Sequence, residues 1–261
     1  MEDYIQSAIN QNVIHYGFSS HSPLNFANKW SILSENLNLY VSEIYRLREK
    51  YKNKLQIFKS LEYDYAPGFS KDADFYHKLL KLDYLIASVH LVLNKQKNEL
   101  WFIDGPREGY LDGINRVFDG DVKRAVLTFF DQTIEMVYNV KPDIIGHFDK
   151  IVMNNQEEFF SSEDEWFLNK ARQALEVIRK NGCIIEVNTR GLYRGKWKYT
   201  FPSPDLLKIC FQQNIPVVIS SDVHSPEEIC MEYASTRELL LKTGYKYQMK
   251  RYENQWVKSY L

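Results

Sequence analysis

The feature that most constrains this chain is the alternation of short apolar runs with segments of helical spacing. Strand-like runs occupy residues 14–19, 55–58, 84–89, 143–146, 183–187 and 216–220. Helical patterns lie at about 2–11, 36–52, 73–80, 121–139, 163–180, 204–213 and 226–242. Apolar strands that alternate with helices predict a parallel sheet covered by helices. We therefore expect one α/β domain over residues 1–261, since α/β barrels of about 250 residues are common.

The loop at about 91–107 is the longest stretch without a clear periodic pattern. It contains Trp101 and the turn formed by Asp104, Gly105 and Pro106. Loops of this length inside a compact domain are often functional. We expect this segment to form a lid or a wall of the active site rather than a domain boundary.

Charge and hydropathy exclude two classes of partner. The chain has 33 basic and 34 acidic side chains, a net charge of −1, so no basic excess is available to bind a nucleic acid. No apolar run approaches the roughly 20 residues that cross a bilayer, and the first residues do not resemble a signal peptide. Three widely spaced cysteines suit a reducing compartment. We expect a cytoplasmic protein; the sequence does not specify its oligomeric state.

Histidines mark the ends of the predicted strands. Four of the six stand directly after strand-like runs, and these are His21, His90, His147 and His224. Glu62 ends the second strand, and Asp222 lies two residues before the last of these histidines. In a parallel barrel, the loops that leave the C-terminal ends of the strands meet at one rim. The sequence therefore predicts that these six side chains lie close together.

This mixture of side chains favours a transition-metal site. Imidazole nitrogen together with carboxylate oxygen suits Zn, Mn or Fe, whereas an all-oxygen set would suit Mg or Ca. A single histidine at a strand end is more often a hydrogen-bonded structural residue. The joint pattern, with acids beside the histidines, favours metal binding. His15 and His77 lack this context, and we interpret them as structural.

Six motifs follow one another along the chain: GFSSHSP (17–23), LEYDY (61–65), ASVH (87–90), GHFDK (146–150), EVNTRGL (186–192) and SSDVHSP (220–226). Together they resemble the histidinol-phosphatases of the polymerase-and-histidinol-phosphatase (PHP) superfamily. The likeness runs from about residue 3 to about residue 245. It implies a distorted (β/α)7 TIM-like barrel that holds up to three divalent metal ions and hydrolyses a small phosphate monoester.

The resemblance also implies a role for each matched site residue. Glu62 corresponds to a carboxylate that bridges the first two metals, and Asp222 to a ligand of the first. We predict catalytic roles for both, because Asp222 could also orient the attacking hydroxide or transfer a proton. The histidines correspond to ligands of the second metal (His90, His147) and of the third (His21, His224).

Substrate contacts are expected from a second group of residues. Arg190 and Arg194 fall where the resemblance implies contact with the substrate phosphate, and a guanidinium can bind phosphate through two hydrogen bonds. An arginine near Lys196 and Lys198 could equally be solvated. The substrate's ammonium and imidazole groups require acceptors or an aromatic wall, for which the candidates are Trp101, Asp104, Asp64 and Tyr65.

One part of the family pattern is missing. The family opens with a strand that bears His-x-His, and no such strand precedes the first helical segment of this chain. We therefore expect an incomplete first-metal site and a barrel without its first strand, which leaves neighbouring strand edges unpaired. The interpretation we favour is an incomplete chain that lacks roughly 15–25 residues, about one strand and a loop. The alternative is a protein that has lost this strand and with it full catalysis.

Three functions remain open on this basis. The first is hydrolysis of L-histidinol phosphate to L-histidinol and phosphate in histidine biosynthesis. The second is another phosphoesterase activity on the same scaffold, and the near-zero net charge argues against a long nucleic acid substrate. The third is a catalytically impaired protein that only binds metal.

Overall fold

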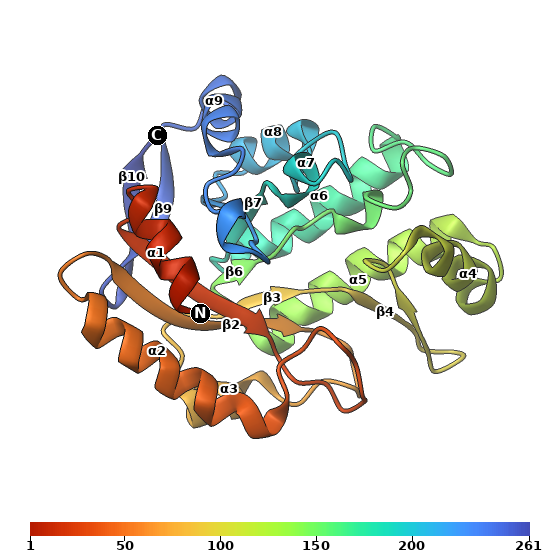
Figure 1. The fold of residues 1–261 in the computed structure, drawn as a ribbon. Coiled ribbons are helices and arrows are strands. Elements are labelled where there is room, and N and C mark those ends of the chain that lie inside the picture. Colours follow the sequence, from red (N-terminus) through yellow and green to blue (C-terminus); the bar gives the residue numbers. More distant parts are fainter.

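The computed structural model describes residues 1–261 and contains one six-stranded parallel sheet (Figure 1). Its order is β1-β2-β3-β6-β7-β8, so hydrogen-bonded neighbours follow the order of the chain. The bounds are β1 His15–His21, β2 Gln56–Asp64, β3 Ile86–Ser88, β6 Ile144–Ile145, β7 Ile184–Asn188 and β8 Val217–Ser220. The six predicted parallel strands are thereby confirmed. Parallel neighbours require crossover connections, which the helices between them provide.

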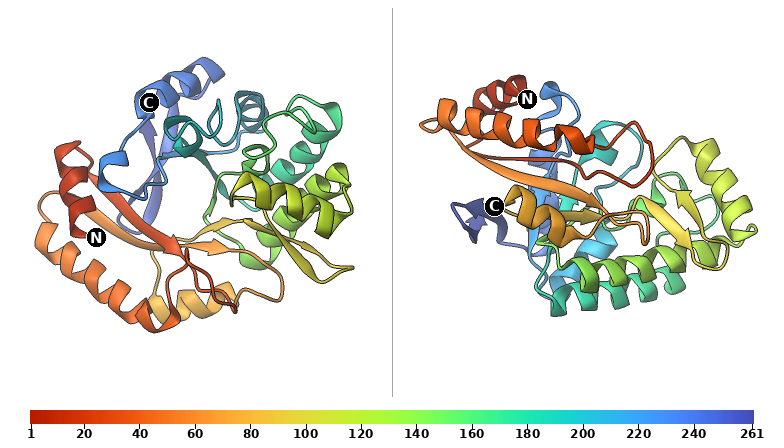
Figure 2. Two further views of the ribbon diagram at one scale, coloured as in Figure 1. Left: turned by 45° about the vertical axis from the view of Figure 1, so that its right-hand side comes forward. Right: turned by 90° about the horizontal axis from the view of Figure 1, so that it is seen from below.

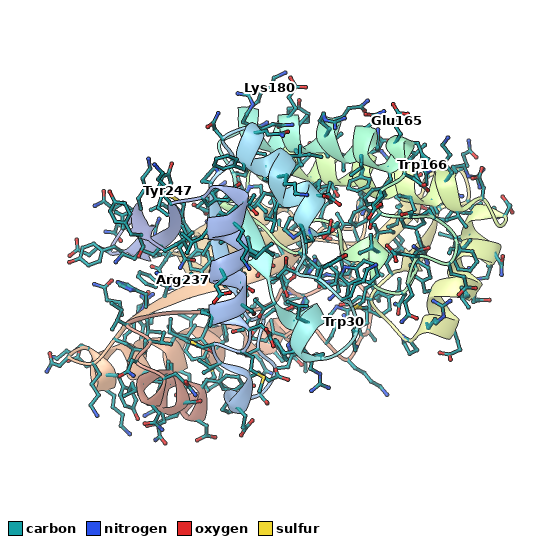
Figure 3. All side chains as sticks on the ribbon, turned by 90° about the horizontal axis from the view of Figure 1, so that it is seen from above. Trp30, Glu165, Trp166, Lys180, Arg237 and Tyr247 are labelled. Carbon is teal, nitrogen blue, oxygen red and sulfur yellow. The ribbon has the colours of Figure 1, made fainter.

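Amphipathic helices cover the outer face of the sheet. They are α2 Leu37–Tyr51, α3 Ala73–Leu80, α5 Val122–Val140, α6 Glu165–Lys180, α8 Pro204–Gln212 and α9 Tyr233–Thr243. Each buries one side; in α2, for example, Tyr40, Ile44 and Leu47 are buried. Figure 3 shows α6 along the outside of the molecule, between its labelled ends Glu165 and Lys180. No helix combines the length and the apolar character that crossing a membrane requires.

The sheet curls into a half-barrel and does not close. Strands β1 and β8 form its two edges, and each pairs with a strand on one side only (Figure 2). A cavity of about 750 Å³ is lined by both edge strands, by α1 (Glu2–Asn10) and by the hairpin of β9 (Tyr247–Tyr252) and β10 (Gln255–Tyr260). Part of the β8 edge is covered, because the backbone N–H of Ile219 donates to Oε1 of Gln248 at 2.9 Å.

The predicted helix over 226–242 is wrong in its first part. A 3-10 turn, η3 (Pro226–Glu228), is followed by backbone with positive φ at Cys230 and Glu232, and α9 begins only at Tyr233. The interruption has a local cause. The carboxylate of Glu228 accepts hydrogen bonds from the backbone N–H groups of His224 and Ser225, which holds this turn against the preceding loop.

The expected loop over 91–107 is a hairpin followed by a helix. Strands β4 (Leu91–Asn94) and β5 (Glu99–Phe102) pair antiparallel, and α4 (Arg107–Phe118) packs against them. Trp101 is fully buried, and its Nε1 donates to the backbone oxygen of Tyr110 at 3.0 Å. The prediction that Trp101 contacts substrate is therefore wrong, because its indole belongs to the core beneath α4.

Two glycines of α4 provide a matched test of this packing. A Cβ at Gly113 would overlap the indole of Trp101, whereas a Cβ at Gly109 would meet no atom within 4 Å. We expect Gly113→Ala to lower the free energy of unfolding by about 1–3 kcal/mol, because it overpacks the core. Gly109→Ala should raise it by about 0.5 kcal/mol, because alanine favours helix. Urea denaturation of both variants checks this, and equal effects would contradict the packing role of Trp101.

Candidate metal centre and active site

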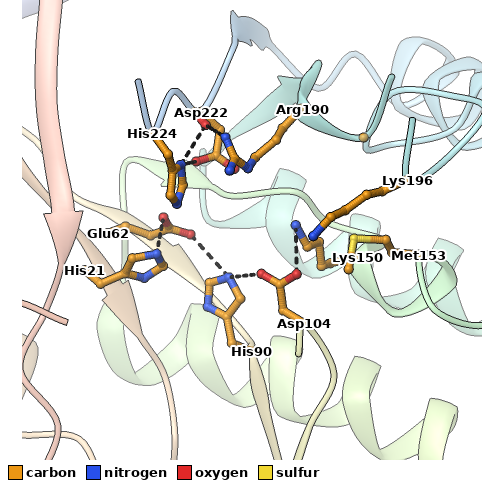
Figure 4. A pocket seen from close by; sticks show the side chains of 11 residues that line it. His21, Glu62, His90, Asp104, Lys150, Met153, Arg190, Lys196, Asp222 and His224 are labelled. Atoms are coloured by element: carbon orange, nitrogen blue, oxygen red, sulfur yellow. Dashed lines mark hydrogen bonds and ion pairs between the residues drawn. The ribbon is translucent and has the colours of Figure 1, made fainter. Parts of the chain in front are cut away.

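Most of the predicted site residues line one polar pocket of about 190 Å³ (Figure 4), and His147 contacts Glu62 without lining the pocket. Its lining consists of His21, Glu62, His90, Asp104, Lys150, Met153, Arg190, Gly191, Lys196, Asp222 and His224. The pocket lies at the C-terminal ends of the parallel strands, where active sites of such barrels lie. His15 and His77 are not among its residues.

Glu62 lies at the centre of the histidine cluster. Its Oε1 is 2.9 Å from Nε2 of His147 and 3.7 Å from Nε2 of His90. Its Oε2 is 3.7 Å from Nε2 of His21. The hydroxyl of Ser88 donates to Oε1 at 2.7 Å and fixes the carboxylate. Each oxygen thus faces at least one imidazole nitrogen, the arrangement that a carboxylate bridging two cations needs.

Asp64 orients two of these imidazoles from behind. Its Oδ1 is 2.6 Å from Nδ1 of His90 and 3.3 Å from Nδ1 of His21, and the indole Nε1 of Trp30 donates to Oδ2 at 3.2 Å. Hydrogen bonds from Nδ1 to a carboxylate leave the Nε2 lone pair free, as in histidines that bind metals. The donor set therefore fits divalent transition metals.

This placement changes the interpretation of two candidate substrate acceptors. Asp64 is only 1% exposed and lies behind the histidines, so the expectation that it accepts the substrate's polar groups is wrong. Tyr65 is also buried, and its hydroxyl accepts a hydrogen bond from Nδ2 of Asn139 at 2.8 Å, away from the pocket. Of these candidates only Asp104, at the end of the β4–β5 hairpin, lines the pocket.

In the metal-free protein, the histidines and carboxylates of the cluster shift one another's pKa values. Burial disfavours a charged His21, but Glu62 and Asp64 outweigh burial and raise the pKa of His21 to about 10. Burial likewise opposes charge on His147, and the hydrogen bond to Glu62 nevertheless raises its pKa. Burial would raise the pKa of Glu62, yet His21 and His147 hold it well below its usual value. Imidazolium charge thus balances the buried carboxylates where cations would otherwise do so.

Zinc binding is expected to release protons near neutral pH. A His21 whose pKa is raised from 6.5 to about 10 is protonated at pH 7 in the metal-free protein and must become neutral to bind zinc. Apparent zinc affinity should therefore rise with pH between 6.5 and about 10. The metal-free fold, conversely, has the full stabilisation from His21 below pH 6.5 and loses it as the pH rises through about 10. Calorimetric titration in buffers of different ionisation enthalpy measures the protons, and zinc binding without proton release at pH 7 would contradict this.

Asp222 and His224 complete the cluster from the loop after β8. Nδ1 of His224 is 3.7 Å from Oδ1 of Asp222, and Nδ2 of Asn188 donates to Oδ2 of Asp222 at 3.1 Å. The His224 side chain is 54% exposed and forms the rim of the site. Asp222 and His147 both have positive φ, of 48° and 22°, a conformation that is strained for residues other than glycine and typical of functional sites.

Of the two arginines predicted to bind phosphate, only one lines the pocket. Arg190 lines the pocket, and its Nη1 donates to the backbone oxygen of Asp222 at 2.9 Å and to Oε2 of Glu228 at 3.1 Å. Arg194 follows the short helix α7 (Arg190–Tyr193), is 52% exposed and faces Oε1 of Glu228 at 3.3 Å. Arg194 is not among the residues that line the pocket, so its contact with the substrate phosphate stays a prediction.

Three pocket or support residues have no counterpart among the predictions. Lys150 and Lys196 line the pocket opposite the histidines. Glu186 is buried beneath it, and its Oε2 accepts hydrogen bonds from the backbone N–H of His147 at 2.8 Å and from Nδ2 of Asn188 at 3.1 Å. Burial raises the pKa of Glu186. Lys150 and Glu186 stand inside motifs noted in the sequence, but only the fold shows what each of them faces.

A curled parallel sheet with imidazoles and carboxylates at the C-terminal ends of its strands defines a metal-dependent enzyme of the α/β-barrel class. The chain belongs to the PHP domain family, whose sequence pattern matches residues 1–190.

Known relatives agree with this assignment. The "Probable histidinol-phosphatase" of Schizosaccharomyces pombe is 27% identical over 94% of this chain and 81% of its own length. The solved structure of the hisK protein of Listeria monocytogenes matches with a TM-score of 0.77 and 24% identity, covering 90% of this chain and 92% of that one. Histidinol phosphate phosphatase of Lactococcus lactis, solved with zinc, L-histidinol and phosphate, matches with a TM-score of 0.71 and 19% identity over 98% and 92%. These two structures establish the shared fold.

Proposed function

We propose that this chain is a metal-dependent phosphatase domain that converts L-histidinol phosphate and water to L-histidinol and phosphate. The observation that carries the proposal is the convergence of three imidazole Nε2 atoms on the carboxylate of Glu62. Support comes from the histidinol-phosphatase relative and from the Lactococcus lactis protein, whose structure holds zinc, L-histidinol and phosphate.

Six residues would hold up to three divalent ions, of which Zn, Mn or Fe suits the donor set. They are His21, Glu62, His90, His147, Asp222 and His224. Divalent cations held here would lower the pKa of bound water and neutralise charge on phosphoryl oxygens. Glu62 and Asp222 are the candidate ligands of the first metal in this proposal. Asp222 is placed to orient the attacking water or to accept its proton.

The remaining pocket residues suit a phosphate monoester. Arg190 and Lys196 offer positive charge for the phosphoryl oxygens, and Asp104 offers a carboxylate for a cationic part of the substrate. A pocket of about 190 Å³ suits a small molecule rather than a nucleic acid chain. We place the reaction in the cytoplasm, because Cys183, Cys210 and Cys230 are all free thiols.

Phosphate release from L-histidinol phosphate tests the proposal directly. The purified chain is stripped with a chelator, reloaded with zinc or manganese, and assayed with measurement of its metal content. We expect phosphate release that depends on the metal. Release from other monoesters but not from histidinol phosphate would indicate a different phosphoesterase, and bound metal without release from any ester would indicate a metal-binding protein.

A further inference from the structure

The pocket has two chemically different sides (Figure 4). The histidines and Glu62 line one side, and Lys150 and Lys196 line the other, with Arg190 near the Asp222 loop. A phosphoryl group that contacted both the metal ions of the first side and the ammonium groups of the second would lie between the two sides. Water attacking from the side of the histidines would place the departing alcohol on the side of the lysines, because the attacking and leaving oxygens lie in line across phosphorus.

Lys150 is held rigidly on the side toward which the alcohol leaves. It belongs to the 3-10 turn η2 (Lys150–Val152) after β6, and its side chain is only 5% exposed. Its Nζ is 3.3 Å from Oδ1 of Asp104 and 5.2 Å from the ring centroid of Phe201. An ammonium group has three N–H donors, so the contact with Asp104 leaves others for a bound substrate.

Lys196 lines the same side but differs in its surroundings. It is exposed and takes part in no ion pair of the structure, so its ammonium can follow a phosphoryl oxygen. Asp104, in contrast, fixes Lys150 and is itself 3.8 Å from Nε2 of His90. The two lysines are therefore suited to different tasks, because Lys150 is buried and ion-paired and Lys196 is exposed and unpaired.

We propose that Lys150 is the catalytic residue that protonates the leaving oxygen of the substrate. This step rests on the proposed function. As the water oxygen bonds to phosphorus, the bond between phosphorus and the alcohol oxygen breaks and its electron pair stays on that oxygen. The oxygen takes a proton from the ammonium of Lys150. The proton released by the attacking water returns to the medium, from which the amine of Lys150 is protonated again.

The chemistry of the leaving group makes this role testable. The alkoxide of an alkyl alcohol is a poor leaving group and needs a proton, whereas 4-nitrophenolate leaves without one. A general acid contributes about 10²–10⁴-fold to the rate of reactions that need it. A residue that only binds the phosphoryl group affects alkyl and aryl substrates alike.

The experiment compares variants of the zinc-loaded protein on L-histidinol phosphate and 4-nitrophenyl phosphate. For Lys150→Met we expect kcat/KM to fall by about 10²-fold or more on the alkyl ester and by less than about tenfold on the aryl ester. Lys196→Met, the matched control, should lower both values by the same factor. Zinc content and the Kd for inorganic phosphate, measured by calorimetry, should change little in Lys150→Met.

Lys150→Arg separates proton donation from charge, because arginine keeps the charge but does not give up its proton. We expect this variant to be as slow as Lys150→Met on the alkyl ester. It also covers the case in which the methionine variant does not fold. Equal losses on both substrates, or full activity of Lys150→Arg, would overturn the proposal.

Failure of the proposed function can be told apart from failure of the Lys150 proposal. If the wild-type chain hydrolyses other phosphate esters but not histidinol phosphate, the proposed substrate is refuted. The Lys150 variants are then compared with glycerol phosphate as the alkyl ester. A wild-type chain that hydrolyses aryl phosphates but no alkyl phosphate overturns the role of Lys150.

Discussion

Glu62→Gln is expected to abolish most of the phosphatase activity and to lower the zinc content of the protein. An amide cannot bridge two cations as a carboxylate does, and the imidazoles around it lose their shared negative partner. If metal catalysis supplies about 4 kcal/mol of transition-state stabilisation, its loss is roughly 10³-fold in kcat/KM. Phosphate-release kinetics together with metal analysis of the purified variant measure both effects.

A surface glutamate provides the control for this substitution. Glu163 is exposed and is not among the residues that line the pocket, so Glu163→Gln should leave both the zinc content and kcat/KM unchanged. If Glu62→Gln retained full activity and metal content, Glu62 could not be the bridging carboxylate.

Asp64→Asn should weaken zinc binding by about 10–100-fold, as expected for loss of a residue that orients metal-binding histidines. Asp64 accepts the Nδ1 protons of His21 and His90. The amide of asparagine can donate to Nδ1 instead, which would move the imidazole proton to Nε2 and block its lone pair. Competition titration with a fluorescent zinc chelator gives the affinity.

Two further variants, one with a smaller expected loss of zinc affinity and one with none, are compared with Asp64→Asn. Trp30→Phe removes only the hydrogen bond to Asp64 and keeps an aromatic ring beside Phe102, which stacks on Trp30 at 4.9 Å. A hydrogen bond of roughly 1 kcal/mol corresponds to an affinity loss of about fivefold. Asp74→Asn, on the exposed face of α3, should have no effect. The same zinc affinity in Asp64→Asn and Asp74→Asn would show that Asp64 does not orient the histidines.

The candidate site lies close to the open edge of the half-barrel. The candidate active-site pocket is built from the C-terminal ends of β1 and β2 and from the segments after β3, β5, β6, β7 and β8, whereas the large cavity lies between the unpaired edges of β1 and β8. His21, Glu62, Asp222 and His224 belong to both lining sets. All four are predicted metal ligands, so the candidate metal centre lies next to the open edge.

Periodicity predicted the sheet, because strands buried on both faces must be apolar and such apolar runs are visible in the sequence. It also predicted the positions of His21, His90 and His224, since a residue that follows a parallel strand lies at the C-terminal rim. The hairpin after His90 was missed, because its short strands carry a pattern too brief to separate from a loop.

Only the tertiary structure decided which side chain does what at the rim. Asp64 and Glu62 are two residues apart on one strand, yet one lies behind the histidines and the other among them. Arg190 lines the pocket and Arg194 does not, and packing beneath α4 removes Trp101 from the pocket. Sequence spacing fixes the strand end at which a residue lies, but the direction of its side chain depends on contacts with elements that are distant along the chain.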